Sequence, residues 1–148
     1  VKLALKQADV IIYSAGTQHS SLYPTYMSAG LAQTIADNHS AYKVFVTNIG
    51  ADYETPDYNV SDYIYGAHRY LNLPDQRSYS MKELFDAMLI NKSRIKAGET
   101  YVEFDDGVKN IPVSLIIDYF ESHAQPGKHD GNKVIETILN LYSANLSL

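Results

Sequence analysis

Two short, mainly apolar runs near the start of the chain are separated by an amphipathic stretch. The runs cover residues 10–13 and 44–47, and apolar side chains recur every four positions between Pro24 and Asn38. Continuous apolar runs are typical of parallel strands covered on both faces, and a recurrence of four is typical of one helix face. The pattern therefore predicts a strand, a helix and a second, parallel strand within residues 8–63.

The same helical period predicts two further helices. One begins near Val60, with Asn59 or Ser61 as its N-cap. The other lies within residues 130–146, where apolar side chains recur at three-and-four spacing along one face. We expect Asp130 to cap this C-terminal helix, because an aspartate at an N-cap accepts from backbone N–H groups that otherwise lack partners.

The region between these helices combines one more helix signal with strand signals. Ser80 and Glu83 have the spacing of a capping box, and apolar side chains through Leu89 extend the predicted helix along one face. Strand-like runs flank a turn at residues 105–107, which predicts a hairpin. The run at residues 113–117 is either the second arm of this hairpin or a separate inner strand.

Together these elements predict an α/β protein with a mainly parallel sheet, plus a C-terminal hairpin and helix. A length of 148 residues lies near the usual size of one domain. We expect one domain over residues 1–148, with a ligand-binding core at 8–63 and the helix, hairpin and C-terminal helix at 78–148. The chain begins without a methionine and leads almost at once into a strand, so we expect it to be part of a larger domain.

The composition excludes several classes of function. A formal net charge of -5 argues against the broad basic face that nucleic acids or anionic membranes require. The absence of cysteine excludes a disulfide scaffold, a cysteine nucleophile and a thiolate zinc site. No apolar run approaches the roughly twenty residues of a membrane span, and no signal-peptide pattern opens the chain. We therefore expect a cytoplasmic protein whose partners include neither nucleic acid nor membrane.

The loop after the first strand has the chemistry of a phosphate-binding loop. Gly16 and Thr17 are followed by His19, Ser20 and Ser21, without a lysine or arginine. A glycine allows the backbone to approach a ligand, hydroxyls donate hydrogen bonds, and the start of the following helix favours an anion. The alternative is an ordinary polar turn, because neither a dinucleotide fingerprint nor a Walker loop is present.

The loop after the second strand is acidic and carries Asn48, Asp52, Glu54 and Asp57. Because the carboxyl ends of neighbouring parallel strands meet at one edge of a sheet, we expect this loop to lie beside residues 16–21. Its carboxylates could hold Mg²⁺ that bridges phosphates, with Asp52 as the candidate ligand, accept from sugar hydroxyls, or act as a general base. They could alternatively be turn and capping residues, which is our interpretation of Asp57.

A Ser-His-Asp hydrolase is a weaker hypothesis. His19 lies beside Ser20, and Asp52 is expected nearby, but the Gly-x-Ser-x-Gly elbow that exposes such a serine is absent. His68 and His123 have no metal-ligand spacing to another histidine. We interpret these two histidines as surface or helix residues.

Several motifs along the chain keep a recognisable order and spacing. They are Ala8-Asp9 before the first strand, Gly16-Thr17, Ser20-Ser21 and Pro24 in the loop, Lys43 to Asn48, Glu54-Thr55, Val60-Ser61-Asp62, and His129-Asp130 with Lys133. In this order they resemble the 2-phospho-L-lactate transferase-like family, especially its gluconeogenesis-factor branch. The resemblance covers most of the chain and is densest over residues 8–63.

This resemblance implies a Rossmann-like three-layer sandwich and a nucleotide-linked ligand, such as a nucleotide or a UDP-sugar. By position, the residues of the phosphate or nucleotide site would be Gly16, Thr17, Ser20, Ser21, Asn48 and Glu54, with His19 where the family has tyrosine. Tyr63 replaces the histidine that follows Ser-Asp in the family. The glycine-rich loop that opens the family's fold is not in this chain. The resemblance therefore implies a C-terminal half, which needs its own upstream half or forms a homo-oligomer.

Three hypotheses for function remain. The first is a nucleotide-binding or nucleotide-sugar-binding protein with a regulatory role in carbon metabolism. The second is a phosphotransferase that depends on Mg²⁺, the one cofactor we consider, and acts on a nucleotide-linked substrate. The third is a structural or interaction module whose loops are ordinary turns.

Overall fold

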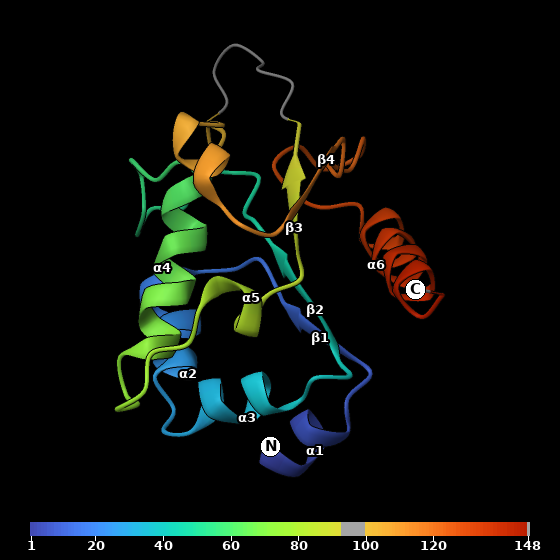
Figure 1. Cartoon of the computed structure of the whole chain (residues 1–148). Helices are drawn as coiled ribbons and strands as arrows, with labels where there is room; N and C mark the ends of the chain where they lie inside the picture. The colour runs from blue at the N-terminus through green and yellow to red at the C-terminus, as the bar shows by residue number, and fades with distance from the viewer. Residues whose placement is uncertain (93–99, 148) are drawn as a thin grey trace.

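The centre of the fold is a parallel sheet of four strands (Figure 1). The computed structural model describes residues 1–92 and 100–147. In spatial order the strands are β1 (Val10–Tyr13), β2 (Tyr42–Val46), β3 (Ala87–Asn91) and β4 (Ser114–Asp118), and each pairs in parallel with the next. This sheet confirms the predicted α/β class with a parallel sheet.

Helical segments precede, connect and follow the strands. They are α1 (Lys2–Gln7), the π-helical turn η1 (Gln18–Leu22), α2 (Tyr23–Tyr26), α3 (Leu31–Asp37), α4 (Val60–Asn72), α5 (Met81–Leu84), the 3₁₀ turn η2 (Asp106–Asn110) and α6 (Gly131–Asn145). In the described ranges, 1–92 and 100–147, no helix is long and apolar enough to cross a membrane.

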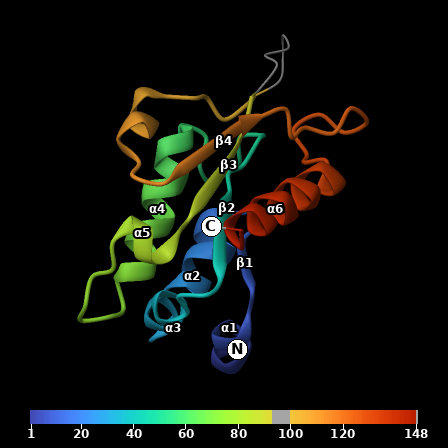
Figure 2. The ribbon, with the colours of Figure 1, turned by 45° about the vertical axis from the view of Figure 1, so that its right-hand side comes forward.

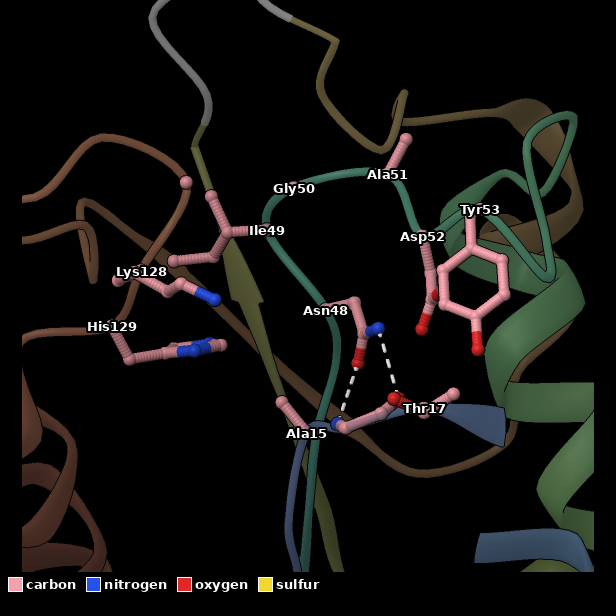
Figure 3. Close-up of a pocket in the computed structure, with 12 residues that line it drawn as sticks. Ala15, Thr17, Asn48, Ile49, Gly50, Ala51, Asp52, Tyr53, Lys128 and His129 are labelled. Carbon is pink, nitrogen blue, oxygen red and sulfur yellow. Dashed lines mark hydrogen bonds between the residues drawn. The ribbon is translucent and has the colours of Figure 1, made fainter. Parts of the chain in front are cut away.

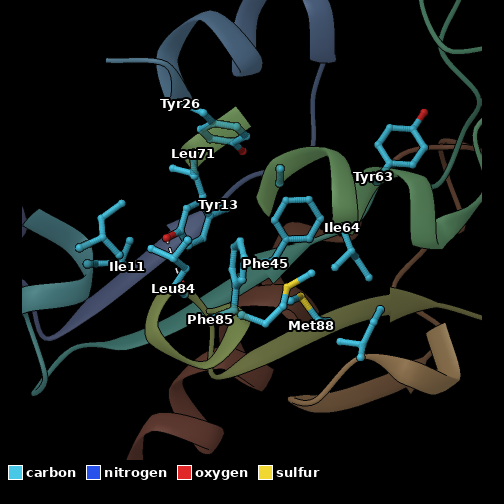
Figure 4. Close-up of a cluster of buried hydrophobic side chains, with 14 of the residues drawn as sticks. Ile11, Tyr13, Tyr26, Phe45, Tyr63, Ile64, Leu71, Leu84, Phe85 and Met88 are labelled. Atoms are coloured by element: carbon cyan, nitrogen blue, oxygen red, sulfur yellow. Dashed lines mark hydrogen bonds between the residues drawn. The ribbon is translucent and has the colours of Figure 1, made fainter. Parts of the chain in front are cut away.

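Helices cover both faces of the sheet, which gives the three layers that the family resemblance implied. On one face Tyr13, Phe45 and Met88 pack in a core with side chains of α2 to α5 (Figure 4). On the other face Val44 and Leu89 pack in a second core with side chains of α6. Figure 2 shows α6 beside the strands on this second face. Alternate strand residues point to opposite faces, so the continuous apolar runs supply both cores.

The predicted strand, helix and parallel strand are confirmed, but the helix is broken. Gly30 has φ +71° and separates α2 from α3, and its backbone N–H donates to Asp75 Oδ1 at 3.0 Å. A glycine adopts this left-handed conformation without the steric cost that a Cβ adds. Met27, which the pattern placed on the buried face of one helix, is 42% exposed in the break.

The helix predicted from Ser80 through Leu89 is wrong beyond its first turn. The capping box of Ser80 and Glu83 is confirmed, but α5 ends at Leu84 and strand β3 follows. Asp86 fixes this change from helix to strand, because it is bound to the neighbouring strand β2. Its carboxylate accepts from Lys43 N at 2.8 Å, and its N–H donates to Lys43 O at 2.8 Å. Pairing in the centre of the sheet outweighs the local helical period.

The predicted hairpin around residues 105–107 is also wrong. The chain forms η2 there, and β4 pairs in parallel with β3, so the alternative of a separate strand is confirmed. That strand stands at an end of the strand order and is not an inner strand. The physical reason is Asp105, whose carboxylate accepts from Ser61 N, Ser61 Oγ and Gly107 N and so ties the turn to the start of α4.

The two remaining helix predictions are confirmed. Helix α4 begins after the N-cap Asn59, which forms a capping box with Asp62. Helix α6 begins after Asp130, whose side chain accepts from Lys133 N at 3.2 Å. The start of α6 matters for the site, because the residues just before it reach the carboxyl edge of the sheet.

Candidate functional site

The loops that follow β1 and β2 lie side by side, as predicted. Asn48 joins them with two hydrogen bonds: its Oδ1 accepts from Gly16 N at 3.0 Å, and its Nδ2 donates to Gly16 O at 3.0 Å (Figure 3). This side-chain amide pairs with the backbone of Gly16 in the way a strand neighbour would. Asn48 therefore sets the spacing of the two loops just beyond the end of the sheet.

A polar pocket of about 440 Å³ opens above these loops. Its lining residues come from three segments of the chain: Ala15, Gly16 and Thr17; Asn48, Ile49, Gly50, Ala51, Asp52 and Tyr53; and Gly127, Lys128 and His129. Four of the residues proposed from sequence lie in this lining, namely Gly16, Thr17, Asn48 and Asp52. The third segment was not predicted as part of a site.

Three of the other proposed site residues, His19, Ser20 and Glu54, pair with one another beside the pocket, whereas the Ser21 carbonyl accepts from Thr25 Oγ1. Glu54 Oε2 accepts from the backbone N–H groups of His19 and Ser20, at 2.9 and 3.1 Å. The Ser20 hydroxyl, followed by these backbone donors, lowers the pKa of the Glu54 carboxyl. Glu54 therefore supplies the negative charge at the start of η1, and neither it, His19, Ser20 nor Ser21 lines the pocket.

His19 belongs to an aromatic cluster. Its Nε2 lies 3.2 Å from Tyr58 Oη, and its ring meets the ring of Tyr23 edge-on at 5.1 Å between centroids. Tyr23 in turn stacks on Tyr70 at 3.9 Å. A histidine held against Tyr58 is not placed as the base for Ser20, so the geometry gives no support to a Ser-His-Asp hydrolase.

The acidic loop is anchored at both ends. Asp52 Oδ1 accepts from Glu54 N at 3.1 Å, and Thr55 N donates to Asp52 O at 3.0 Å, which closes a turn. Beyond this turn Thr55 Oγ1 and Tyr63 Oη form a buried hydrogen bond of 2.7 Å. Tyr63, which stands where the family has histidine, thus fixes the end of the loop.

The third segment reaches the pocket through a tight turn. Gly127 has φ +75°, and its N–H donates to Glu121 Oε1 at 2.6 Å. The same carboxylate oxygen accepts from Tyr101 Oη at 2.7 Å. The turn packs directly on the acidic loop, since a Cβ added to Gly50 would lie 3.4 Å from Gly127 O, at van der Waals contact. Lys128 follows this turn and brings a positive charge to the pocket.

Lys128 and His129 differ in charge. Lys128 is exposed, and in the described part of the chain its ammonium group forms no ion pair. Burial lowers the pKa of the His129 imidazole, against the opposing effect of a hydrogen bond to the Thr47 backbone. His129 is therefore neutral near pH 7, and Lys128 carries the positive charge of the lining.

A metal ion would need ligands beyond this lining. Asp52 is the carboxylate of the pocket, and within residues 1–92 and 100–147 no group of three histidine, aspartate or glutamate side chains is arranged to hold a metal. Mg²⁺ often keeps water and binds through one or two carboxylates together with substrate phosphates. Asp52 fits that limited role and no larger one.

Sequence reasoning missed Lys128 and His129 because they lie more than a hundred residues from Gly16. The sequence indicates Asp130 as a helix cap, and the structure confirms this. The available signal was the order of Gly127, Lys128 and His129 directly before an N-cap, in which a glycine turn presents a cation. That signal is common in proteins and does not by itself indicate a site. The packing of α6 against the sheet is what brings these residues to the pocket.

The fold and the pocket define a Rossmann-like α/β protein with a polar site at the carboxyl edge of a parallel sheet, where open α/β folds bind ligands. Comparison with protein families makes the class specific. The model of the family described as 2-phospho-L-lactate transferase CofD matches residues 1–146, and the chain belongs to this family.

Individual relatives agree with this family and are longer than the chain. A protein named gluconeogenesis factor from Halalkalibacterium halodurans is 26% identical over 140 residues, which is 92% of this chain and 43% of that protein. A relative with a similar name from Nostoc sp. is 31% identical over 90 residues, 60% of this chain and 18% of that protein.

The solved structures show the same fold. A crystal structure of a protein from Bacillus halodurans superposes with a TM-score of 0.76 at 24% identity, and covers 93% of this chain and 45% of that protein. A second crystal structure of a Bacillus halodurans protein superposes with a TM-score of 0.76 at 23% identity. The chain thus spans less than half the length of the relatives it matches.

Proposed function

We propose that this chain forms one wall of a site for a nucleotide or nucleotide sugar, in a protein with a role in carbon metabolism, which the relatives' name, gluconeogenesis factor, supports. The observation that carries the proposal is the pocket itself. It joins the predicted phosphate loop at Gly16 and Thr17 to Lys128, a cation from the segment just before α6, which is distant in the sequence. A phosphate is the ligand that suits close backbone, a hydroxyl and an ammonium group together.

The charges of the lining favour one orientation of the ligand in the pocket. Figure 3 shows Lys128 and His129 on one side of the pocket and Asp52 on the other. Phosphate oxygens are favoured beside Lys128, and sugar hydroxyls, which donate to carboxylates, are favoured beside Asp52. Glu54 has a supporting role in this proposal, because it holds the backbone of His19 and Ser20.

The test is calorimetric titration of the full-length protein with UDP-sugars, GDP and GTP, with and without Mg²⁺. Lys128→Ala should weaken binding about tenfold or more, because a charge-assisted hydrogen bond contributes about 1.5–3 kcal/mol. Gly16→Asp should abolish binding, because it places a carboxylate against the phosphates. Lys82→Ala is the matched control, since Lys82 is exposed on α5 and lies outside the lining.

The outcomes separate the hypotheses for function. Failure of the intact protein to bind any of these nucleotides would refute the proposal and leave the interaction module. Turnover that requires Mg²⁺ and is lost in Asp52→Asn would support the phosphotransferase instead of a regulatory binding protein. Tight binding without turnover would support regulation.

A further inference from the structure

Tyr53 stands at the pocket with its aromatic ring uncovered. The residue is 85% exposed, although it lies in the lining beside Asp52 (Figure 3). Other tyrosines of this region pack on one another, as Tyr23 does on Tyr70 and Tyr58 does on Tyr63. Among the ring contacts of the described residues, Tyr53 has none.

The backbone that carries this ring is nevertheless held in a defined position. Tyr53 occupies the turn that Asp52 closes with Thr55, so its backbone is fixed on both sides. Its hydroxyl donates to Glu54 Oε1 at 3.4 Å, and the other oxygen of Glu54 accepts from the loop after β1. An aromatic side chain has few rotatable bonds, so on a fixed backbone it loses little conformational entropy when a ligand packs on it.

The surrounding charges decide which part of a ligand this ring receives. Asp52 and Glu54 flank Tyr53, and their negative charges disfavour phosphate there. The positive Lys128 lies on the other side of the pocket (Figure 3). A ligand whose phosphates contact Lys128 therefore directs its opposite end toward Tyr53.

We propose that Tyr53 is the stacking surface for the nucleobase of the bound nucleotide. This inference rests on the proposed function of the pocket and adds to it the position of the base and the residue that holds it. Stacking on an aromatic ring tolerates any base, because every base has a planar face. The carboxylates beside the ring then favour a base edge that carries N–H donors.

The test compares a nucleoside diphosphate with inorganic pyrophosphate on the full-length protein by calorimetry. Tyr53→Ala should weaken binding of the nucleoside diphosphate about tenfold and leave pyrophosphate affinity unchanged, because pyrophosphate has no base to stack. Tyr53→Phe should retain wild-type affinity, since the ring and not the hydroxyl makes the contact. Tyr65→Ala is the control for loss of a partly exposed tyrosine on α4.

Three results would overturn the inference while the proposed function stands. Unchanged nucleotide affinity in Tyr53→Ala shows that the base lies elsewhere. Equal loss in Tyr53→Phe and Tyr53→Ala assigns the effect to the hydroxyl. A marked fall in melting temperature in Tyr53→Ala, with equal weakening of both ligands, shows that Tyr53 supports the fold. If the wild-type protein binds neither ligand, the proposed function fails first and the stacking role fails with it.

Discussion

At the scale of single residues, the pocket is defined by where each charge is placed. Lys128 is exposed and charged, whereas burial keeps the neighbouring His129 neutral near pH 7. Glu54 is held as a carboxylate by the hydroxyl and N–H of Ser20 and the N–H of His19. The lining therefore presents one positive charge, on Lys128, and one carboxylate, that of Asp52, with Glu54 beside the pocket, which suits a ligand with distinct phosphate and hydroxyl ends.

The partly buried His129 should make stability depend on pH. Its pKa is lowered in the folded protein, whereas the unfolded chain has a histidine pKa of about 6.5. As pH falls below about 6.5, the unfolded chain binds a proton that the folded protein does not, so the free energy of unfolding decreases. This loss continues until pH reaches the lowered pKa of the folded state.

We expect His129→Gln to reduce this pH dependence. Urea unfolding of wild type and variant at about pH 7 and about pH 5.5 measures it, in a range above the ordinary pKa values of aspartate and glutamate near 4. The wild-type protein should lose more stability than the variant between the two conditions. An equal loss in both proteins would show that protonation of His129 is not coupled to folding.

At the scale of elements, single side chains fix how segments distant in sequence meet. Asn48 pairs with the backbone of Gly16 and so joins the loops after β1 and β2. Asp105 joins the start of α4 to η2 through Ser61 and Gly107. These hydrogen bonds lower the pKa of the Asp105 carboxyl despite the opposing effect of its desolvation. Each of the two side chains thus bonds to the backbone of a segment that is distant in the sequence.

Removal of the Asp105 cap should destabilise two elements together. Asp105→Ala leaves the N–H groups of Ser61 and Gly107 without their acceptor, and we expect a cost of about 1–3 kcal/mol in the free energy of unfolding. Asp106→Ala is the matched control one position on. It removes an exposed ion pair with Lys109, which is worth at most about 1 kcal/mol.

Urea denaturation of both variants measures the difference. A cost for Asp105→Ala no greater than that for Asp106→Ala would contradict the capping role. The pair also tests why the predicted hairpin does not form, because Asp105 serves the start of α4 instead of a two-residue turn.

At the scale of the whole molecule, the two hydrophobic cores contribute differently to the structure. The core with α2 to α5 stabilises the sheet, whereas the core with α6 also positions the residues that precede this helix. Ile138 is 1% exposed in the second core and anchors α6. His129 lies two residues before α6 begins at Gly131, so the packing of the helix sets the position of the pocket wall.

Weaker packing of α6 should therefore affect both stability and binding. Ile138→Ala should cost about 2–5 kcal/mol in the free energy of unfolding and also weaken nucleotide binding several-fold, because the wall that carries Lys128 loosens. Leu71→Ala in the first core, where Leu71 is 0% exposed, should cost similar stability with little effect on binding. Denaturation and calorimetry of both variants, at a temperature where both remain folded, make the comparison. Equal effects on affinity would refute the link between α6 and the pocket.

Elements whose signals are local could be predicted from the sequence. The strands at residues 10–13 and 44–47, the N-caps Asn59 and Asp130 and the capping box of Ser80 depend on neighbours within a few residues, and the structure confirms them. The proximity of the first two loops also followed, because parallel strands end at one edge. Apolar periodicity failed at β3, where a central position in the sheet replaced a helix.

The sequence by itself determined the α/β class, the parallel pairing of the first two strands and the acidic and hydroxyl-rich character of their loops. Only the tertiary structure decided that Glu54 is bound by the backbone of its neighbour loop, and that Lys128 and His129 complete the pocket. The physical reason is the distance along the sequence between the residues that make each contact. Helix caps and strand runs report contacts between near neighbours, whereas a site joined from Gly16 and Lys128 depends on the packing of α6 across the sheet.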